Sequence, residues 1–354
     1  MAVGTARIAR DIAFTLEVKS PKIFENIFLN NGVLCMLGAK GRVKIVRGGN
    51  RFDERVRLGQ NSNVDHRNKF AEIPTDYQNN VRTAEYGHAV VSGAVPVNLV
   101  EIDQNSGSSA ISNLAEDAVQ ELMNTFANKV AGGLMASSST GTGPVSIVEE
   151  LEATAFGSQT RTTGGIARSD YPGTGTDGRT AAWQTQYTNT SADLSAAAGL
   201  ATMQAFLLTC SEGTGKMYTP DIFLTTNGVY SQISGNSDVL RRYSVNDKIM
   251  NLGFDNIMVG GATMIGDANV PAGYGYAINT NFMRVQVLAG PKTKRTGSVT
   301  VVGDGAVSVP IQVLAPVEAG NKLEYVVKAY MVYNLTPQSL KYHGLMDNLT
   351  EASA

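Results

Sequence analysis

The sequence predicts an α+β protein in which helical and strand-like runs are grouped along the chain rather than strictly alternating. Apolar residues recur at helical spacing in two segments, 108–136 and 190–213. Short strand-like segments bounded by Gly, Asn and Pro follow from residue 221 onward. Two further strand-like segments flank a long polar stretch, 59–80, and this arrangement predicts an extended hairpin.

Length and composition indicate a globular chain whose surface suits contact with other subunits. At 354 residues the chain exceeds the usual size of one hydrophobic core, so we expect about two domains. Its 43% of hydrophobic residues suffices for such cores, whereas only 17% are charged. A surface poor in charge loses little solvation when another subunit covers it.

Charge and cysteine content exclude several classes of protein. A formal net charge of −2 gives no global attraction to a nucleic-acid backbone, so specific DNA binding is not expected. Arg7 and Arg10 interrupt the N-terminal segment, and no later stretch is apolar enough to span a membrane, so we expect neither secretion nor membrane insertion. Cys35 and Cys210 lie far apart, which fits a reducing cytoplasm and predicts neither a disulfide framework nor a zinc site.

The N-terminal hundred residues predict an arm followed by the hairpin. Residues 1–41 carry only short apolar clusters and are expected to form an arm without a core of its own. Alternation over 51–58 predicts a half-exposed strand, and a second strand is expected over 81–97. Sides of ~15–20 residues at ~3.3 Å each would extend roughly 50–65 Å, beyond the radius of a compact domain. Such a hairpin must contact another subunit or extend into solvent.

A long helix follows the cap cluster Ser106–Ser109, and we call it the spine helix. Its core positions are expected to be Ile111, Leu114, Ala118, Leu122 and Phe126. The opposite face, with Glu116, Gln120 and Asn124, is expected nearer solvent. The Gly-, Ser- and Thr-rich segment 137–180 predicts loops around a short element at 145–151.

A second helix is expected to begin at Thr190 and to end near Gly213. Its proposed apolar stripe comprises Leu194, Ala198, Ala201, Ala205 and Leu208. A third helix is expected within 229–252. Strands are predicted over 221–225, 257–265, 274–279, 284–288 and 298–302. The segment 323–334 is apolar on both faces, which predicts a strand buried inside a sheet.

Catalytic, cofactor and metal sites are not expected. Gly213–Lys216 resembles part of a phosphate loop, but Met217 replaces the magnesium-binding Ser or Thr and Cys210 the first glycine, so a helix-terminal turn is favoured. No Gly-x-Ser-x-Gly nucleophile spacing occurs. The three histidines, His66, His88 and His343, lack metal-ligand spacing and are expected to be surface or strand residues.

Clustered charges are expected to be solvated. The neighbours Asp53 and Glu54, and likewise Glu149 and Glu150, do not share a face, so a surface role is favoured over acid–base chemistry. One basic cluster comprises Lys292, Lys294 and Arg295. An ordinary exposed turn is favoured there over contact with DNA or with an acidic neighbour.

The order of several short motifs resembles the major capsid proteins of tailed bacteriophages, which have the Hong Kong 97 type of fold. The collinear pieces are Gln104–Gly107, Thr163–Arg168 with Trp183, Pro220–Thr226, Gly253–Asp255, Gly260–Ala262 with Gly266–Asp267, and Val270–Gly273 followed by Tyr276–Thr280. Each motif alone is weak, and their order over roughly 40–335 carries the resemblance.

The resemblance implies five regions: an N-terminal arm (1–41), an extended E-loop hairpin (42–100), a peripheral domain with the spine helix (101–184), an axial domain (185–310), and C-terminal strands returning to the peripheral domain, with a tail (311–354). It further implies a non-enzymatic virion protein, without cofactors, that assembles in the host cytoplasm into pentamers and hexamers of an icosahedral head around double-stranded DNA. Partners would be other copies of the chain, a portal, a separate scaffolding protein and a decoration protein. The alternatives are an encapsulin-like compartment shell, a tail or adhesin protein that forms trimers or small rings, and an enzyme of a class that the motifs do not reveal.

The expected hairpin tip concentrates Asp65, Arg67, Lys69 and Glu72. We predict that these charges contact complementary charges on a neighbouring subunit. Family members that form covalent cross-links use a lysine of this hairpin and an asparagine of a neighbour, and Lys69 is the only lysine between Lys44 and Lys129. Ionic docking is favoured over such a cross-link, because a lysine in a polar loop is ordinary.

Overall fold

A computed structural model describes most of the chain. The described residues are 32–59, 61, 63–77, 80–98, 121–122, 124–136, 143–171, 182–211, 217–235, 257–289, 293–296, 299–302, 311–314, 317–318 and 324–350. The expected arm residues 1–31, the start of the spine helix and the Gly213–Lys216 segment lie outside these ranges.

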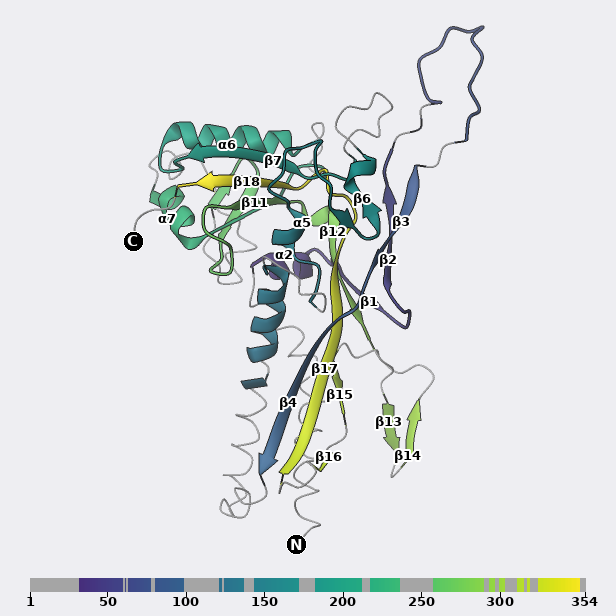
Figure 1. Ribbon diagram of the computed structural model, residues 1–354, viewed down its shortest axis with the longest axis vertical. Coiled ribbons are helices and arrows are strands. Elements are labelled where there is room, and N and C mark those ends of the chain that lie inside the picture. Colours follow the sequence, from purple (N-terminus) through teal and green to yellow (C-terminus); the bar gives the residue numbers. More distant parts are fainter. Residues whose placement is uncertain are drawn as a thin grey trace.

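The first sheet is built around one long strand (Figure 1). Its members are β1 (Val43–Val46), β4 (Ala89–Asn98), β12 (Met283–Leu288), β15 (Ile311–Val313), β16 (Val317–Glu318) and β17 (Glu324–Pro337). β17 pairs antiparallel with β4 along ten residue pairs and also with β12, β15 and β16. The strand predicted at 323–334 is therefore confirmed as an interior strand, with partners on both edges. One face is buried, through Val327, Ala329, Met331 and Tyr333, whereas Lys328 on the other face is exposed.

The second sheet has six strands in the order β7-β18-β11-β8-β10-β9. They span β7 (Gln186–Ala192), β8 (Ile222–Thr225), β9 (Ile257–Val259), β10 (Ala262–Gly266), β11 (Gly275–Ile278) and β18 (Gly344–Leu349). β18 was not expected, since six residues with Asp347 and Asn348 give little strand pattern. It lies between β7 and β11, so this segment does not return to the first sheet with β17.

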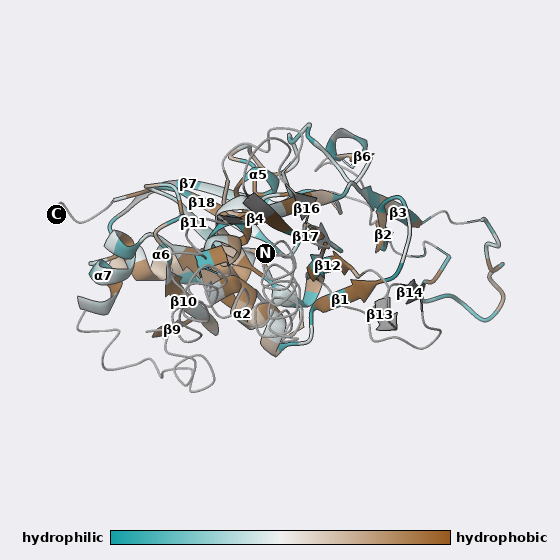
Figure 2. Cartoon of the chain, turned by 90° about the horizontal axis from the view of Figure 1, so that it is seen from below, coloured by the Kyte–Doolittle hydropathy of each residue, from teal (hydrophilic) through white to brown (hydrophobic). Residues whose placement is uncertain are grey.

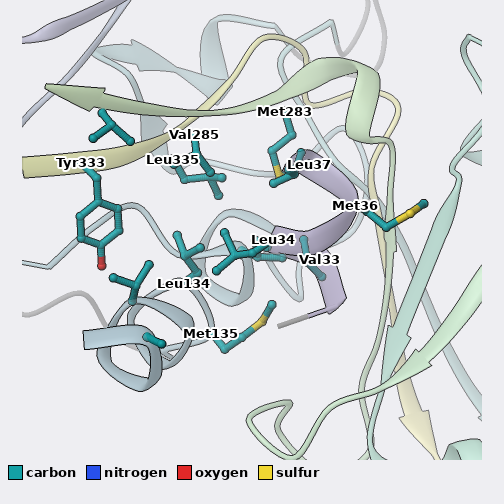
Figure 3. Close-up of a cluster of buried hydrophobic side chains, with 14 of the residues drawn as sticks. Val33, Leu34, Met36, Leu37, Leu134, Met135, Met283, Val285, Tyr333 and Leu335 are labelled. Atoms are coloured by element: carbon teal, nitrogen blue, oxygen red, sulfur yellow. The ribbon is translucent and has the colours of Figure 1, made fainter. Parts of the chain in front are cut away.

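Two helices join the sheets into one core. α2 (Gly32–Ala39) buries Val33 through Leu37, so the last residues of the expected arm are a core helix instead. Figure 3 shows Leu34 and Leu37 of α2 facing Leu134 of the spine helix and Met283 of β12. An unbroken run of large apolar residues cannot remain exposed, which is why the arm prediction fails there.

The second helix, α6 (Ala197–Thr209), begins later than expected and buries the opposite face. Thr190 lies in β7. Of the predicted stripe, Leu194 is buried ahead of the helix, whereas the other positions are exposed, namely Ala198, Ala201, Ala205 and Leu208. The buried side contains Leu200, Met203, Phe206 and Leu207. The larger side chains gain more from burial than the alanines of the predicted stripe do. α7 (Asn227–Gly235) begins two residues before the range 229–252 expected for the third helix and overlaps its start.

The E-loop hairpin is shorter than expected. β2 (Phe52–Arg57) pairs with β3 (Val81–Tyr86) over six residue pairs, and β4 leaves the hairpin to pair with β17. The alternation of buried and exposed residues predicted for 51–58 is confirmed, with Phe52, Val56 and Leu58 buried. The remaining small elements are α5 (Ile147–Glu150), β5 (Thr162–Thr163), β6 (Ile166–Ala167), η1 (Arg168–Asp170), η2 (Thr280–Phe282), and the β13–β14 hairpin (Thr293–Thr296, Val299–Val302).

Candidate assembly surface

The loop between β2 and β3 carries exposed apolar side chains that no other described part of the chain covers. We call residues 63–77 the loop tip. Its large apolar residues are Val64 (79% exposed), Phe70 (87%), Ile73 (74%) and Tyr77 (93%). Figure 1 shows this segment standing away from the body of the molecule, and Figure 2 shows hydrophobic and hydrophilic stretches alternating along it. Four large exposed apolar side chains on one projecting loop are typical of an interaction site.

The loop tip is shaped by a few local hydrogen bonds. Asn63 Nδ2 donates to the backbone oxygen of Asp76 at 2.8 Å, which ties the two sides of the tip together. Arg67 Nη1 donates to the backbone oxygen of Glu72 at 3.2 Å. Lys69 Nζ lies 4.7 Å from the ring centre of Phe70, an exposed cation–π contact.

The four predicted contact residues, Asp65, Arg67, Lys69 and Glu72, all lie on the loop tip and are exposed. Within the described residues, none of the four forms an ion pair. Their carboxylates and cationic groups are therefore available to another chain. Sequence reasoning missed the apolar residues between them, although four large apolar side chains in a polar stretch were a readable signal.

The root of the hairpin is held rigidly by a small core. Phe52, Val56, Leu58, Ala84 and Tyr86 pack with Ile166, Trp183 and Leu340. The hydroxyl of Tyr86 donates to the backbone oxygen of Pro337 at 2.9 Å, and burial is the main reason why the pKa of Tyr86 is raised. Gly164 (φ 57°) brings the β5–β6 turn so close that a Cβ there would lie 2.8 Å from the Cβ of Ala84. The projecting loop thus starts from a fixed base.

A buried carboxylate joins the hairpin to the first sheet. Glu54 on β2 is 5% exposed and accepts hydrogen bonds from Gln286 Nε2 at 2.9 Å and Gln338 Nε2 at 3.0 Å. Arg284 Nη1 and Lys44 Nζ lie 3.4 and 3.9 Å from its Oε1. The expected surface role of Glu54 is wrong, because four polar partners from β1, β12 and the segment after β17 satisfy it inside the protein.

A second buried network lies beneath the same root. Arg168 is fully buried, and its Nη2 donates to Glu150 Oε2 at 2.8 Å, to the Glu150 backbone oxygen at 2.7 Å and to Thr163 Oγ1 at 3.1 Å. Burial lowers the pKa of Arg168, and the carboxylate of Glu150 opposes that shift. The surface role expected for Glu149 and Glu150 is wrong for Glu150, which is buried; Glu149 pairs with half-exposed Arg161 at 2.8 Å.

The spine-helix positions are only partly described. Helical residues are 121–122 and 124–134, in which Phe126 is buried, Leu122 is half buried and Asn124 is exposed. Ile111, Leu114 and Ala118, like Glu116 and Gln120, lie outside the described residues. β4 approaches this helix at Gly93, where a Cβ would lie 2.4 Å from Leu122 Cδ1 and 2.7 Å from Phe126 Cε2.

The histidines lie in three different settings, and His343 differs from the expectation. His66 is exposed on the loop tip and His88 stacks edge-on against Phe52. His343 is completely buried, and its Nδ1 accepts a hydrogen bond from the Asn279 backbone N–H at 3.1 Å. Burial lowers the pKa of His343 to about 4, so its ring is neutral at pH 7.

Within the ranges that the structure describes, no cluster of three or more His, Cys, Asp or Glu side chains is placed to hold a metal ion. In the same ranges, no helix has the length and apolar character needed to cross a membrane. Of the predicted basic cluster, Lys294 and Arg295 belong to strand β13 rather than to a turn.

Comparison with known proteins links this arrangement to shell proteins. No family model matches the chain, and no curated protein matches its sequence. Among solved structures, the capsid of cyanophage A-1(L) superposes with a TM-score of 0.60 at 17% identity, over 89% of this chain and 93% of that chain. The capsid of an empty GTA particle superposes with a TM-score of 0.53 at 11% sequence identity, over 88% of this chain and 89% of that chain.

The SrpI encapsulin of Synechococcus elongatus PCC 7942 gives a TM-score of 0.51 at 12% identity, over 88% of each chain. The chain has the phage capsid fold. The α+β capsid fold expected from the order of the motifs is therefore confirmed. The division into arm, E-loop, peripheral and axial domains stays a prediction.

Proposed function

We propose that the chain is the major capsid protein of a tailed bacteriophage, a structural subunit without catalytic activity. Many copies assemble as pentamers and hexamers into an icosahedral head around double-stranded DNA. The observation that carries the proposal is the loop tip, because its apolar side chains are exposed on a chain whose fold is that of capsid proteins. Exposed apolar area of this kind is tolerated when a second subunit covers it.

The proposed contact is heterologous: the loop tip of one copy meets a different surface of the next. Such contacts close into rings when the rotation between copies permits. Asp65, Arg67, Lys69 and Glu72 are proposed to contribute ion pairs across this contact. Each exposed pair contributes only about 0.2–1 kcal/mol, but the contact is repeated over every copy in a shell.

The proposed partners are other copies of the chain, together with a separate scaffolding protein, a portal and a decoration protein. The packaged DNA is proposed to lie near the shell without specific recognition, in keeping with the net charge of −2. The proposed location is the virion, with assembly in the cytoplasm of the host.

Electron microscopy of the purified protein, alone and with its scaffolding protein, tests the proposal. We expect closed shells with fivefold and sixfold capsomers. Trimers or small rings would instead indicate a tail or adhesin protein, and a stable monomer under all conditions would exclude a shell-forming role.

An encapsulin-like compartment is the second candidate, favoured by the TM-score of 0.51 to an encapsulin. The contents of shells isolated from infected cells separate the two. Nuclease-protected double-stranded DNA supports the phage head, whereas a packaged protein cargo supports the compartment.

A further inference from the structure

A partly open cavity of about 310 Å³ lies between the N-terminal half of β4 and the C-terminal half of the spine helix. Its walls come from Ala89 through Ser92, from Lys129 and Gly133, from Gly143 and Pro144, and from Tyr333. An apolar cavity of about 150 Å³ already accommodates benzene, so this one has room for an aromatic side chain and neighbouring atoms. Val90, on its wall, is 57% exposed.

The cavity contains a polar group that lacks a partner. Tyr333 is only 1% exposed, and its hydroxyl makes no hydrogen bond within the part of the chain that the structure describes. A Cβ built on Gly133 would lie 3.2 Å from this hydroxyl, which places the Tyr333 Oη at the wall that Gly133 and Pro144 form. Buried hydroxyls in native proteins nearly always have a partner, so this one indicates that something polar enters the cavity.

The loop tip offers a matching group. Tyr77 is the most exposed of its apolar residues and supplies both an aromatic ring and a hydroxyl. Phe70, the other aromatic residue, already lies under the ammonium of Lys69. Asp76, next to Tyr77, is exposed, and Lys129 at the rim of the cavity is exposed as well. The two surfaces are therefore complementary in polarity and charge, and the cavity has room for an aromatic side chain.

We infer that Tyr77 on the loop tip of one copy inserts into the Tyr333 cavity of a second copy, with Asp76 beside Lys129. The inference rests on the proposed function and names the receiving surface for the loop tip. The tip cannot fill the cavity of its own chain without leaving the projecting position that the hairpin root fixes (Figure 1). Because every copy carries both surfaces, the contact is heterologous and can propagate around a ring.

Disulfide trapping tests the geometry directly. The double variant Asp76→Cys, Lys129→Cys should give ladders of covalent oligomers on a non-reducing gel after mild oxidation. Background is low, because both native cysteines, Cys35 and Cys210, are buried. The matched control pairs Asp76→Cys with Lys328→Cys, since Lys328 is exposed on β17 but does not line the cavity. The control should remain monomeric on the gel.

The outcomes separate the inference from the function on which it rests. Closed shells of the double variant without ladders would overturn the inference and leave the shell function intact. If the double variant gives ladders but the protein forms no closed shell, the contact would be supported and the proposed shell-forming function would be contradicted. Ladders of equal strength in the control would also overturn the inference, because the trapping would then be nonspecific.

A charge exchange tests the same contact without oxidation. Lys129→Glu should raise the protein concentration needed for half-maximal assembly by about tenfold, and adding Asp76→Lys should restore it. Tyr77→Ala should impair assembly more than Phe70→Ala. Equal effects of the two aromatic substitutions, or no rescue by Asp76→Lys, would count against the cavity as the receiving surface.

Discussion

Arg168 illustrates how a single buried charge holds the base of the projecting loop. It reaches Glu150 at the end of α5, Thr163 in β5 and, through Nη1 at 3.0 Å, Oε1 of Gln159 in the loop between them, so three segments converge on one guanidinium. Its Nε has no partner within the described residues, which leaves part of its desolvation uncompensated. The arrangement favours one fixed geometry of the hairpin root over the greatest possible stability.

Replacing Arg168 by Ala should destabilise the subunit by about 3–5 kcal/mol, because buried Glu150 would lose its hydrogen-bonded counter-charge and keep only the Nε of Arg161 at 3.7 Å. Urea unfolding of the unassembled subunit measures the change. Arg51→Ala is the matched control, since its pairs with Asp53 and Glu85 are exposed, and we expect a loss of about 0–1 kcal/mol. Equal losses in the two variants would contradict the role assigned to Arg168.

His343 predicts a pH dependence of folding. The pKa of its ring is near 4 in the folded chain and about 6.5 when unfolded, so the unfolded state takes up the proton first as pH falls. Stability is therefore full above about pH 6.5 and decreases between pH 6.5 and 4, by up to about 3 kcal/mol. Protonation would also place an N–H opposite the Asn279 N–H.

Melting temperatures of the unassembled subunit across pH 7 to 4 test this, with His343→Gln as the comparison. The glutamine variant does not titrate in this window and should show a clearly shallower pH dependence. Parallel curves for the two proteins would show that other groups govern the acid sensitivity.

At the scale of the elements, the close approach of β4 to the spine helix depends on a missing side chain. Gly93→Val should destabilise the subunit by about 1–3 kcal/mol, because the new side chain would overlap Leu122 and Phe126. Ala94→Val, one residue along the same strand and exposed, should change stability by less than about 0.5 kcal/mol. Unfolding by denaturant distinguishes the two, and a neutral Gly93→Val would mean that the helix can move away at no cost.

Leu122→Ala is expected to destabilise by less than the ~2–5 kcal/mol of a fully buried leucine, because Leu122 is only half buried. Phe126→Ala should cause the larger loss, about 3–5 kcal/mol, since Phe126 is buried. Melting of both variants checks the order. A larger loss for Leu122→Ala than for Phe126→Ala would mean that the side of the spine helix with Phe126 is not the side that packs against β4.

Sequence alone predicted those elements whose pattern reflects their burial. The alternation in β2 follows from burial of one face against the small core at the hairpin root, and the apolar run of β17 follows from its interior place in the first sheet. The face of α6 could not be chosen in this way, because both of its sides carry small or apolar residues. The partners of Glu54 come from β1, β12 and the segment after β17, and such long-range contacts leave no local pattern in the sequence.

On the scale of the whole molecule, the loop tip combines charges that the sequence revealed with apolar groups whose exposure only the fold revealed. Changing Arg67 and Lys69 together to Glu should leave the subunit folded and reduce assembly or the salt resistance of the shells. Light scattering at increasing salt measures this. Normal particles with unchanged salt tolerance would exclude ionic docking by these two residues.

A covalent cross-link through Lys69, the alternative to ionic docking, can be tested separately on a gel. Ladders of oligomers on a reducing, denaturing gel that Lys69→Arg abolishes would establish a cross-link, because arginine keeps the charge but is a far weaker nucleophile. We expect no ladders, since the ammonium of Lys69 lies over Phe70 and ordinary ionic contacts suffice.

The position of β18 has a consequence for synthesis of the protein. β18 lies between β7 and β11, so the second sheet remains split into two parts until residues 344–349 have left the ribosome. A nascent chain can therefore expose its loop tip well before its second sheet is complete. A chain that ends before residue 344 would lack the strand that joins β7 to the rest of the second sheet, and would leave the edges of β7 and β11 unpaired.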